Sequence, residues 1–271
     1  MAERRKYEST RRGNPRQLTV AQHIHSRWCI SNFADKDGCV AVLRRGQTKP
    51  FCTKPDNDIF CVKRAWGEHL ERGLFLEVEG SFHEVVKSAL TTGSVTNHQS
   101  VTKYVTIWQI RAQFAERPPD DVVLQGIESS PLSGWTKDEE EILEKKRWTF
   151  LRGGTVPGRL SAFIPAVRDF HFTMSQLKNV RWGVLRTKDC PGFICPDRPA
   201  HELYVPIART MALVAGYVDQ EVDSVTVDDL NQSTQEQAGQ LVFGHPVDIG
   251  AFVDRRETAQ FSAGMITPTG S

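Results

Sequence analysis

The sequence predicts an α+β fold, with an N-terminal β-hairpin region, central helices and a C-terminal β-rich segment that together form one mixed domain. Two long stretches in the middle of the chain repeat apolar residues every three or four positions, which is the period of an amphipathic helix. Short β-favouring runs, separated by Gly or Pro, lie on either side of them. The chain has 271 residues, of which 39% are hydrophobic and 25% charged, so it is long enough to bury a core.

The N-terminal residues 1–18 predict a disordered basic arm, because they hold six Lys or Arg and few apolar side chains. An arm that contacts phosphate is the functional alternative. Residues 19–35 fit either a helix or a strand. Residues 38–46 predict a strand, since they are rich in β-favouring side chains and have Gly at both ends.

Two central helices are predicted from the apolar period. Residues 66–90 predict an amphipathic helix with a broad apolar face. Residues 99–116 predict a second helix, which Pro118 and Pro119 end. Both helices therefore have one face to bury.

A third helix is predicted from a local capping signal. Thr136 and Glu139 have the spacing of a capping box, which predicts a charged helix that reaches about Trp148. Residues 160–178 predict a further helix, despite Pro165 near its start.

The last third of the chain is predicted to be β-rich, with a short helix over residues 225–239 and a strand over residues 241–244. The main domain is predicted to cover residues 19–255, and residues 256–271 are predicted to form a flexible tail. The other predicted strands of this region are 180–187, 192–195, 202–207 and 210–218.

Charge and cysteine content exclude several classes of protein. The formal net charge is +1, so only a local patch can support binding to nucleic acid, and no membrane partner is expected. No window approaches the roughly 18 to 20 apolar residues of a membrane span, and the polar N-terminus predicts a cytoplasmic protein. The six cysteines are spaced unlike a typical zinc site, the closest pair being Cys190 and Cys195, which predicts free thiols.

The opening of the predicted domain resembles a bacterial family. The family pattern is approximately Q-H-Y-x-P-x-x-x-L-x-x-F, and the chain keeps Gln22, His23, an apolar Ile30 and Phe33, with Ser26 in place of the usual Pro. The chain is thus similar to the domain-of-unknown-function family numbered 4238. The resemblance implies N-terminal hairpins, a Glu-containing helix and a terminal strand.

Later stretches extend this resemblance to roughly residues 20–255. Residues 70–79 resemble the family's Glu-containing helix, and Trp182 with residues 193–199 resembles its W…F-I-x-S-D-N-P stretch. In that stretch, Pro196 and Arg198 replace the usual Ser and Asn. Leu230-Asn231 and the strand over 241–244 take the places of the family's last helix and strand. The family has no established activity, so the resemblance implies none.

Four polar residues in otherwise apolar stretches form the candidate catalytic set: His23, Glu71, Glu79 and Asp197. A buried carboxylate must be paired or bound to a ligand. If these residues converge, His23, Glu79 and Asp197 can hold Mg²⁺ or Mn²⁺, which favour oxygen ligands. This arrangement would suit a metal-dependent hydrolase, such as a nuclease-type toxin or defence effector.

The same four residues also have a structural explanation. In this explanation, His23 and Asp197 are buried hydrogen-bonding residues. The two glutamates are then expected to pair with one of three arginines: Arg27, Arg64 or Arg72. His25 is expected to be exposed, and a thiol nucleophile made by Cys29 or Cys195 near His23 is a further alternative.

The second functional hypothesis is a non-catalytic module that binds a protein or nucleic acid through the charged, Trp-containing region 120–158. The chain has no nucleophile elbow, no phosphate-binding loop and no dinucleotide-binding fingerprint. Basic residues cluster at 1–16, 44–45, 63–64 and 145–147, with four Trp near some of these: Trp28, Trp66, Trp135 and Trp148. Such a combination on one face can stack single-stranded nucleic acid.

Overall fold

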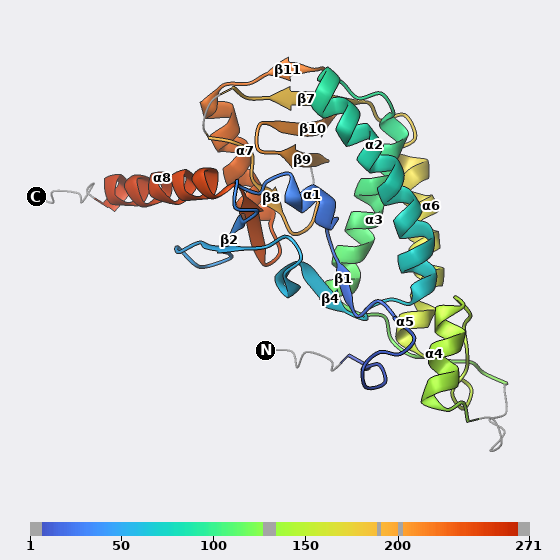
Figure 1. The fold of residues 1–271 in the computed structure, drawn as a ribbon. Helices are drawn as coiled ribbons and strands as arrows, with labels where there is room; N and C mark the ends of the chain where they lie inside the picture. The colour runs from blue at the N-terminus through green and yellow to red at the C-terminus, as the bar shows by residue number, and fades with distance from the viewer. Residues whose placement is uncertain (1–6, 127–133, 189–190, 200–202, 265–271) are drawn as a thin grey trace, which may run out of the picture. The chain divides into compact units, whose positions relative to one another are not determined.

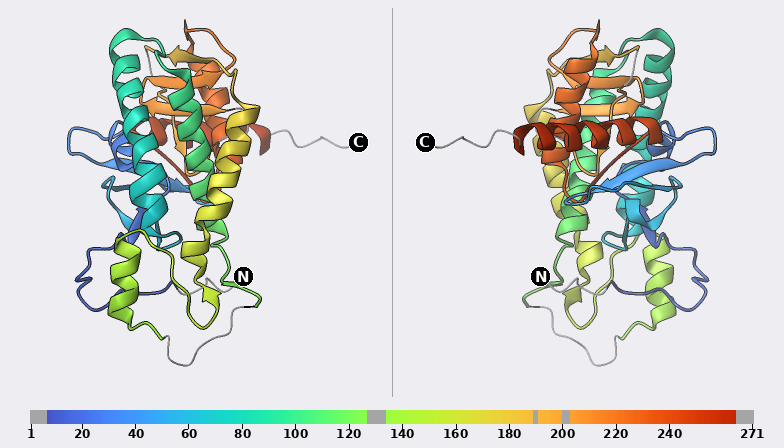
Figure 2. Two further views of the ribbon diagram at one scale, coloured as in Figure 1. Left: turned by 90° about the vertical axis from the view of Figure 1, so that its right-hand side faces the viewer. Right: turned by 90° about the vertical axis from the view of Figure 1, so that its left-hand side faces the viewer.

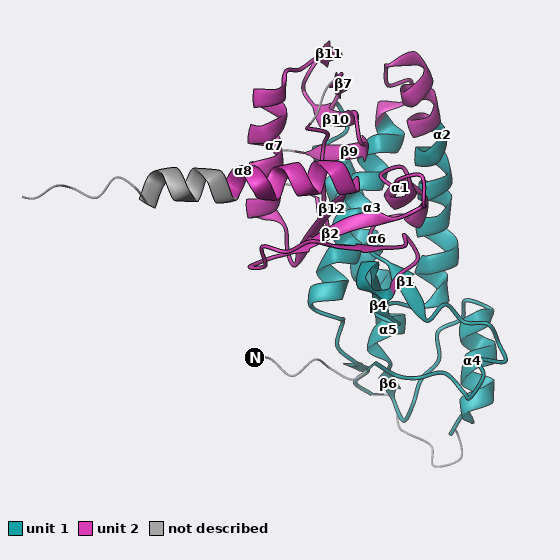
Figure 3. Ribbon diagram, turned by 60° about the vertical axis from the view of Figure 1, so that its left-hand side comes forward, with its two compact units in different colours: residues 1–24, 58–84, 99–179 teal, residues 25–57, 85–98, 180–271 magenta. Residues whose placement is uncertain are grey.

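The computed structural model describes residues 7–126, 134–188, 191–199 and 203–264, except for the side chains of 257–264. It has the α+β class that the sequence predicts, with helices and mostly antiparallel strands (Figure 1). The chain divides into two compact units, each made from three separate segments (Figure 3). Unit 1 comprises residues 1–24, 58–84 and 99–179, and unit 2 comprises the remainder. No helix in the described ranges is long and apolar enough to cross a membrane.

Unit 1 is mainly helical. Its elements are β1 (Ala21–His23), η1 (Asp58–Phe60), β4 (Cys61–Lys63), the π-helical turn η2 (Leu70–Phe75), the first part of α2 (Leu76–Thr92), α3 (His98–Glu116), β5 (Val122–Val123), α4 (Lys137–Lys145), β6 (Thr155–Val156), α5 (Gly158–Ser161) and α6 (Phe163–Gln176).

Aromatic side chains join the helices of unit 1. Phe82 of α2 stacks on Tyr104 of α3, with ring centroids 3.8 Å apart, and Trp66 contacts Phe75 edge-to-face. All four rings are buried. The helices α2, α3 and α6 run alongside one another (Figure 2). Their packing gives unit 1 the buried face that the apolar period predicts.

Short strands connect the helices of unit 1. β1 pairs with β4 in an antiparallel ladder, in which His23 lies opposite Cys61. β5 pairs with β6 in a second antiparallel ladder. The helix predicted from residue 66 begins as η2 and has non-helical backbone at Gly73. The second predicted helix is α3 and is confirmed.

Unit 2 contains two four-stranded sheets. Its elements are α1 (Arg27–Ser31), β2 (Val40–Arg44), β3 (Phe51–Thr53), the end of α2, β7 (Trp182–Arg186), β8 (Cys195–Pro196), β9 (Tyr204–Ala208), β10 (Met211–Ala215), β11 (Gln220–Glu221), α7 (Ser224–Gln237), β12 (Leu241–Gly244) and α8 (Pro246–Gly264).

One helix covers a face of each sheet of unit 2. The sheets have the strand orders β11-β7-β10-β9 and β3-β2-β12-β8. Val227 of α7 joins a core with Leu185 and Val214 of the first sheet. Ile249 and Phe252 of α8 join a core with residues of the second sheet. The β2–β3 hairpin confirms the hairpin predicted near the N-terminus.

The N-terminal arm differs from the prediction over its described part. Residues 1–6 lie outside the described residues, but residues 7–18 contact α4 through charged groups. Arg16 donates to Asp138 at 2.7 Å and the Arg11 N–H donates to Glu141 at 2.6 Å, while Leu18 is buried. Acidic side chains of α4 hold the basic residues of this segment, which composition alone does not indicate.

The end of the chain also differs from the prediction. The flexible tail is predicted from residue 256, whereas α8 continues to Gly264, and residues 265–271 lie outside the described part. Most of the strand predicted over 192–195 is irregular. Two of its N–H groups bond to side chains instead of a neighbouring strand: Gly192 donates to Asp248 and Ile194 donates to Asn231.

Candidate functional site

The candidate catalytic residues are distributed over both units. His23 ends β1, Glu71 lies in η2 and Glu79 lies in α2, all within unit 1. Asp197 directly follows β8 in unit 2. Within unit 1, the structure brings Glu71 and Glu79 to the same arginine.

That arginine is Arg111 of α3, which the sequence analysis did not single out. Arg111 donates to Glu79 at 2.5 Å and lies over the ring of Phe75. Glu71 accepts a 2.6 Å hydrogen bond from the indole N–H of Trp66. Burial raises the pKa of Glu71, and the charge of Arg111 and the Trp66 bond offset only part of this. Both carboxylates are therefore held by protein groups.

Asp197 has a structural role in unit 2. Its carboxylate accepts the backbone N–H groups of Gly239 and Gln240, both at 2.7 Å. Its own N–H donates to the carbonyl of Leu241. Burial raises the pKa of Asp197, and the hydrogen bonds from the Gly239 and Gln240 N–H groups offset only part of this rise. Asp197 thus joins β8 to the turn before β12, which is the structural alternative given for it.

Among the described residues, no group of three or more His, Cys, Asp or Glu side chains is placed to hold a metal ion. The Mg²⁺ or Mn²⁺ site and the hydrolase that depends on it therefore stay predictions. The expected pairing of the glutamates with Arg27, Arg64 or Arg72 is wrong for Glu79, because its partner is Arg111. Arg72 pairs instead with Glu68, whose carboxylate is buried.

The candidate thiol nucleophile has the wrong environment. His25, which was expected to be exposed, is buried, and its Nε2 lies 3.9 Å from Sγ of Cys195. Burial raises the pKa of Cys195 well above that of an ordinary thiol. A nucleophilic cysteine needs a lowered pKa and solvent access. None of the described cysteines forms a disulfide, and Cys190 lies outside the described residues.

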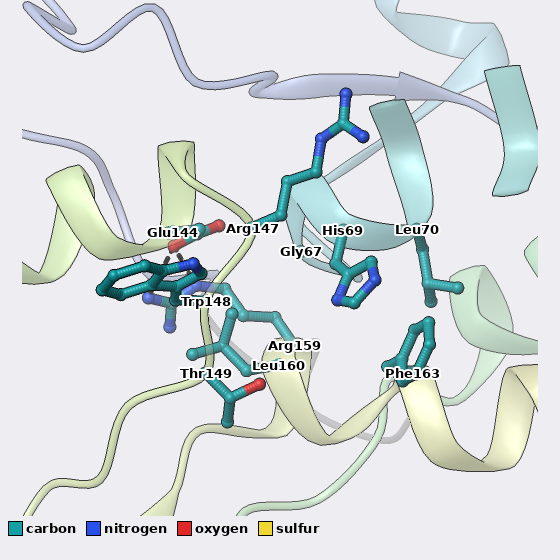
Figure 4. A pocket seen from close by; sticks show the side chains of 10 residues that line it. All are labelled: Gly67, His69, Leu70, Glu144, Arg147, Trp148, Thr149, Arg159, Leu160 and Phe163. Carbon is teal, nitrogen blue, oxygen red and sulfur yellow. Dashed lines mark hydrogen bonds and ion pairs between the residues drawn. The ribbon is translucent and has the colours of Figure 1, made fainter. Parts of the chain in front are cut away.

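A surface hollow in unit 1 is lined by aromatic and charged side chains that converge from separate segments (Figure 4). Trp148 lies on one side, while His69 and Phe163 lie on the other, with Arg159 between them. His69 and Phe163 stack with centroids 4.1 Å apart. The other lining residues are Gly67, Leu70, Glu144, Arg147, Thr149 and Leu160.

Local backbone geometry places Trp148 on the surface. The capping box of Thr136 and Glu139 is confirmed at the start of α4. At its other end, the N–H of Arg147 bonds to Glu144 O and the N–H of Trp148 bonds to Leu143 O, which is a Schellman motif. Arg147 takes the left-handed position with φ of 65°, where Gly is the usual residue. Trp148 is 61% exposed.

Buried ion pairs fix the floor of the hollow. Glu144, with 2% of its side chain exposed, lies 2.9 Å from both Arg64 and Arg159. Gly67 allows Leu160 to approach closely, because a Cβ there would lie 2.9 Å from a Leu160 methyl group. The carboxylate of Glu144 therefore faces two guanidinium groups, and that of Arg159 also pairs with Glu8.

The hollow is shallow and presents mainly ring faces and cations. Its cavity volume is about 10 Å³, close to the room that one water molecule needs. Pockets that enclose small-molecule substrates are typically about 300 to 1,000 Å³. Burial, and then the charge of Arg147, lower the pKa of His69, which favours the neutral form of its ring. A ligand would lie across this site rather than inside it.

Sequence reasoning found one side of this site and missed the other. The cluster 145–147 and Trp148 were identified as basic and aromatic neighbours, and the Lys146 ammonium lies 5.7 Å from the Trp148 ring centroid. His69, Phe163 and Arg159 gave no periodic or motif signal. Arg64 and Trp66, which were considered for the same surface, are buried.

No family model, curated protein or solved structure matches this chain. The resemblance to the family numbered 4238 therefore stays a prediction. What the chain does has to be argued from its own residues.

Proposed function

We propose that this protein is a non-catalytic module that binds single-stranded nucleic acid at the Trp148 hollow. The observation that carries the proposal is Trp148, a residue 61% exposed, across from the His69–Phe163 stack. Proteins that bind single strands combine aromatic faces, on which bases stack, with cations that follow the backbone. Arg147, Lys146 and Arg159 supply the cations here. We place this activity in the cytoplasm as part of the same proposal.

The backbone of Arg147 supports the proposal independently. An L-residue in the left-handed region costs roughly 1–2 kcal/mol relative to Gly, and such strain clusters at functional sites. The chain keeps a long cationic side chain at a position where Gly would be favourable for stability. A cation that contacts a ligand phosphate accounts for this choice.

The test is the affinity for a fluorescently labelled single-stranded oligonucleotide, measured by anisotropy at low salt. Stacking contributes about 1–3 kcal/mol per base, so we expect Trp148→Ala to bind roughly tenfold more weakly than the unchanged protein. Trp135→Ala is the matched control, since Trp135 is also exposed, at 47%, but does not line the hollow. It should bind normally.

Equal losses in the two variants, or no binding by the unchanged protein, would contradict the proposal. The same samples, incubated with Mg²⁺ or Mn²⁺ and examined for shortened oligonucleotide, test the predicted hydrolase. Cleavage that depends on Glu79 and Asp197 would favour the enzyme over the binding module.

A further inference from the structure

A carboxylate of the N-terminal segment occupies a cationic site next to the hollow. Glu8 accepts from both terminal nitrogens of Arg152, at 2.6 and 3.0 Å. It also pairs with Lys137 at the start of α4 and with Arg159 of α5. Three cations from three separate segments therefore surround one carboxylate, which is an unusually complete site for a single anion.

The charge of this cluster exceeds what its fixed carboxylates neutralise. Without Glu8, four cations remain with two carboxylates, because Glu140 pairs with Arg152 and Glu144 pairs with Arg159 and Arg64. Nε and Nη1 of Arg64 are buried and donate to no acceptor, whereas Nη2 of Arg159 lies 2.9 Å from Glu144. The cluster thus has spare positive charge and spare donors, which an anion with several oxygens suits better than a carboxylate.

The site is accessible from solvent. About a third of each of the side chains of Glu8, Lys137 and Arg152 is exposed, at 33%, 33% and 38%. Arg159 belongs both to this site and to the lining of the hollow. An anion in the place of Glu8 would therefore contact Arg159, which also lines the hollow where a nucleic-acid base would stack on Trp148.

We propose that Lys137, Arg152 and Arg159 form the phosphate-binding part of the single-strand site, and that Glu8 occupies it in the free protein. This inference rests on the proposed function and adds regulation to it. The backbone phosphate next to the stacked base displaces Glu8, so residues 7–18 leave α4 when the strand binds. The segment acts as an internal competitor that lowers the apparent affinity.

The first test removes the competing charge. Glu8→Gln should bind the labelled oligonucleotide roughly five- to tenfold more tightly than the unchanged protein, because a larger fraction of molecules has an open site. Glu77→Gln is the matched control, since it makes the same change of charge at an exposed position of α2. It should leave the affinity unchanged. Adding Arg152→Gln to the Glu8→Gln protein should abolish the gain.

A second measurement uses the unchanged protein. Hydrogen exchange of the backbone amide of Arg11 should become faster when oligonucleotide is added, because this N–H loses its bond to Glu141 of α4. Unchanged exchange, or equal affinities for Glu8→Gln and Glu77→Gln, would overturn the inference. If Trp148→Ala still weakens binding in that case, the proposed function stands. If no variant binds oligonucleotide, both fail.

Discussion

Arg111 is the charged residue on which the two glutamates of unit 1 depend. Only 3% of its side chain is exposed, and 17% of its partner Glu79. Removing one partner of a buried pair leaves the other charge uncompensated, which costs more than the pair contributes. Glu71 differs, because burial already raises its pKa and its hydrogen-bond donor is the neutral Trp66.

We therefore expect Glu79→Gln to lower the free energy of unfolding by roughly 3 kcal/mol, the low end for a broken buried pair, since Glu79 keeps some exposure. Glu71→Gln keeps an acceptor for the Trp66 N–H, so we expect it to change the free energy of unfolding by less than about 1 kcal/mol. Urea unfolding at pH 7 measures both. Equal losses would show that Glu71 also serves as a charged partner.

At the C-terminal end of α4, replacing Arg147 by Gly should have opposite effects on stability and on oligonucleotide binding. Arg147→Gly relieves the left-handed backbone, so we expect the free energy of unfolding to rise by about 0.5–1 kcal/mol. The same change removes a cation beside the hollow and should weaken oligonucleotide binding. Arg147→Gln is the control, because it removes the charge and keeps the strain. It should weaken binding without any gain in stability.

Among the helices and strands, those that depend on residues close together in the sequence were predicted. The α4 capping box, β2 and α3 follow from local spacing and were predicted. The helix α8 was missed, and its buried Asp248 pairs with Arg209 from a distant segment, a contact that no local pattern indicates.

The candidate site shows the same limit. Trp148 and the basic residues before it were found because they are adjacent in sequence. His69, Arg159 and Glu8 join them only through folding, across 151 positions in the case of Glu8 and Arg159. No periodicity or spacing in the sequence indicates a contact between residues so far apart. One chain without aligned relatives gives no covariation from which to infer it.

For the whole molecule, acid should release the N-terminal segment. Burial alone would raise the pKa of Glu8, but Arg152, Arg159 and Lys137 lower it from 4.5 to about 2. A carboxyl with a lowered folded pKa contributes stability above its unfolded pKa and loses it as the pH falls through the folded value. The contribution of Glu8 is therefore complete above about pH 5 and lost towards pH 2.

We expect the melting temperature of the unchanged protein to exceed that of Glu8→Gln at pH 7. The difference should shrink between pH 4.5 and pH 2 and then vanish, because both side chains are then neutral. Scanning calorimetry across this range measures it. A difference that persists at pH 2 would mean that Glu8 acts through packing rather than charge.

The pairing of β2 with β12 joins Arg44 to Leu241, about 200 residues later in the chain. A ribosome adds roughly 5–20 residues per second, so β2 waits about 10–40 seconds for this neighbour during synthesis. Until then, one edge of an apolar strand with a buried Val40–Leu43 stretch has no partner. Open strand edges of this kind recruit other chains. A newly synthesised copy of this protein therefore depends on protection, or on dilution, until β12 has been made.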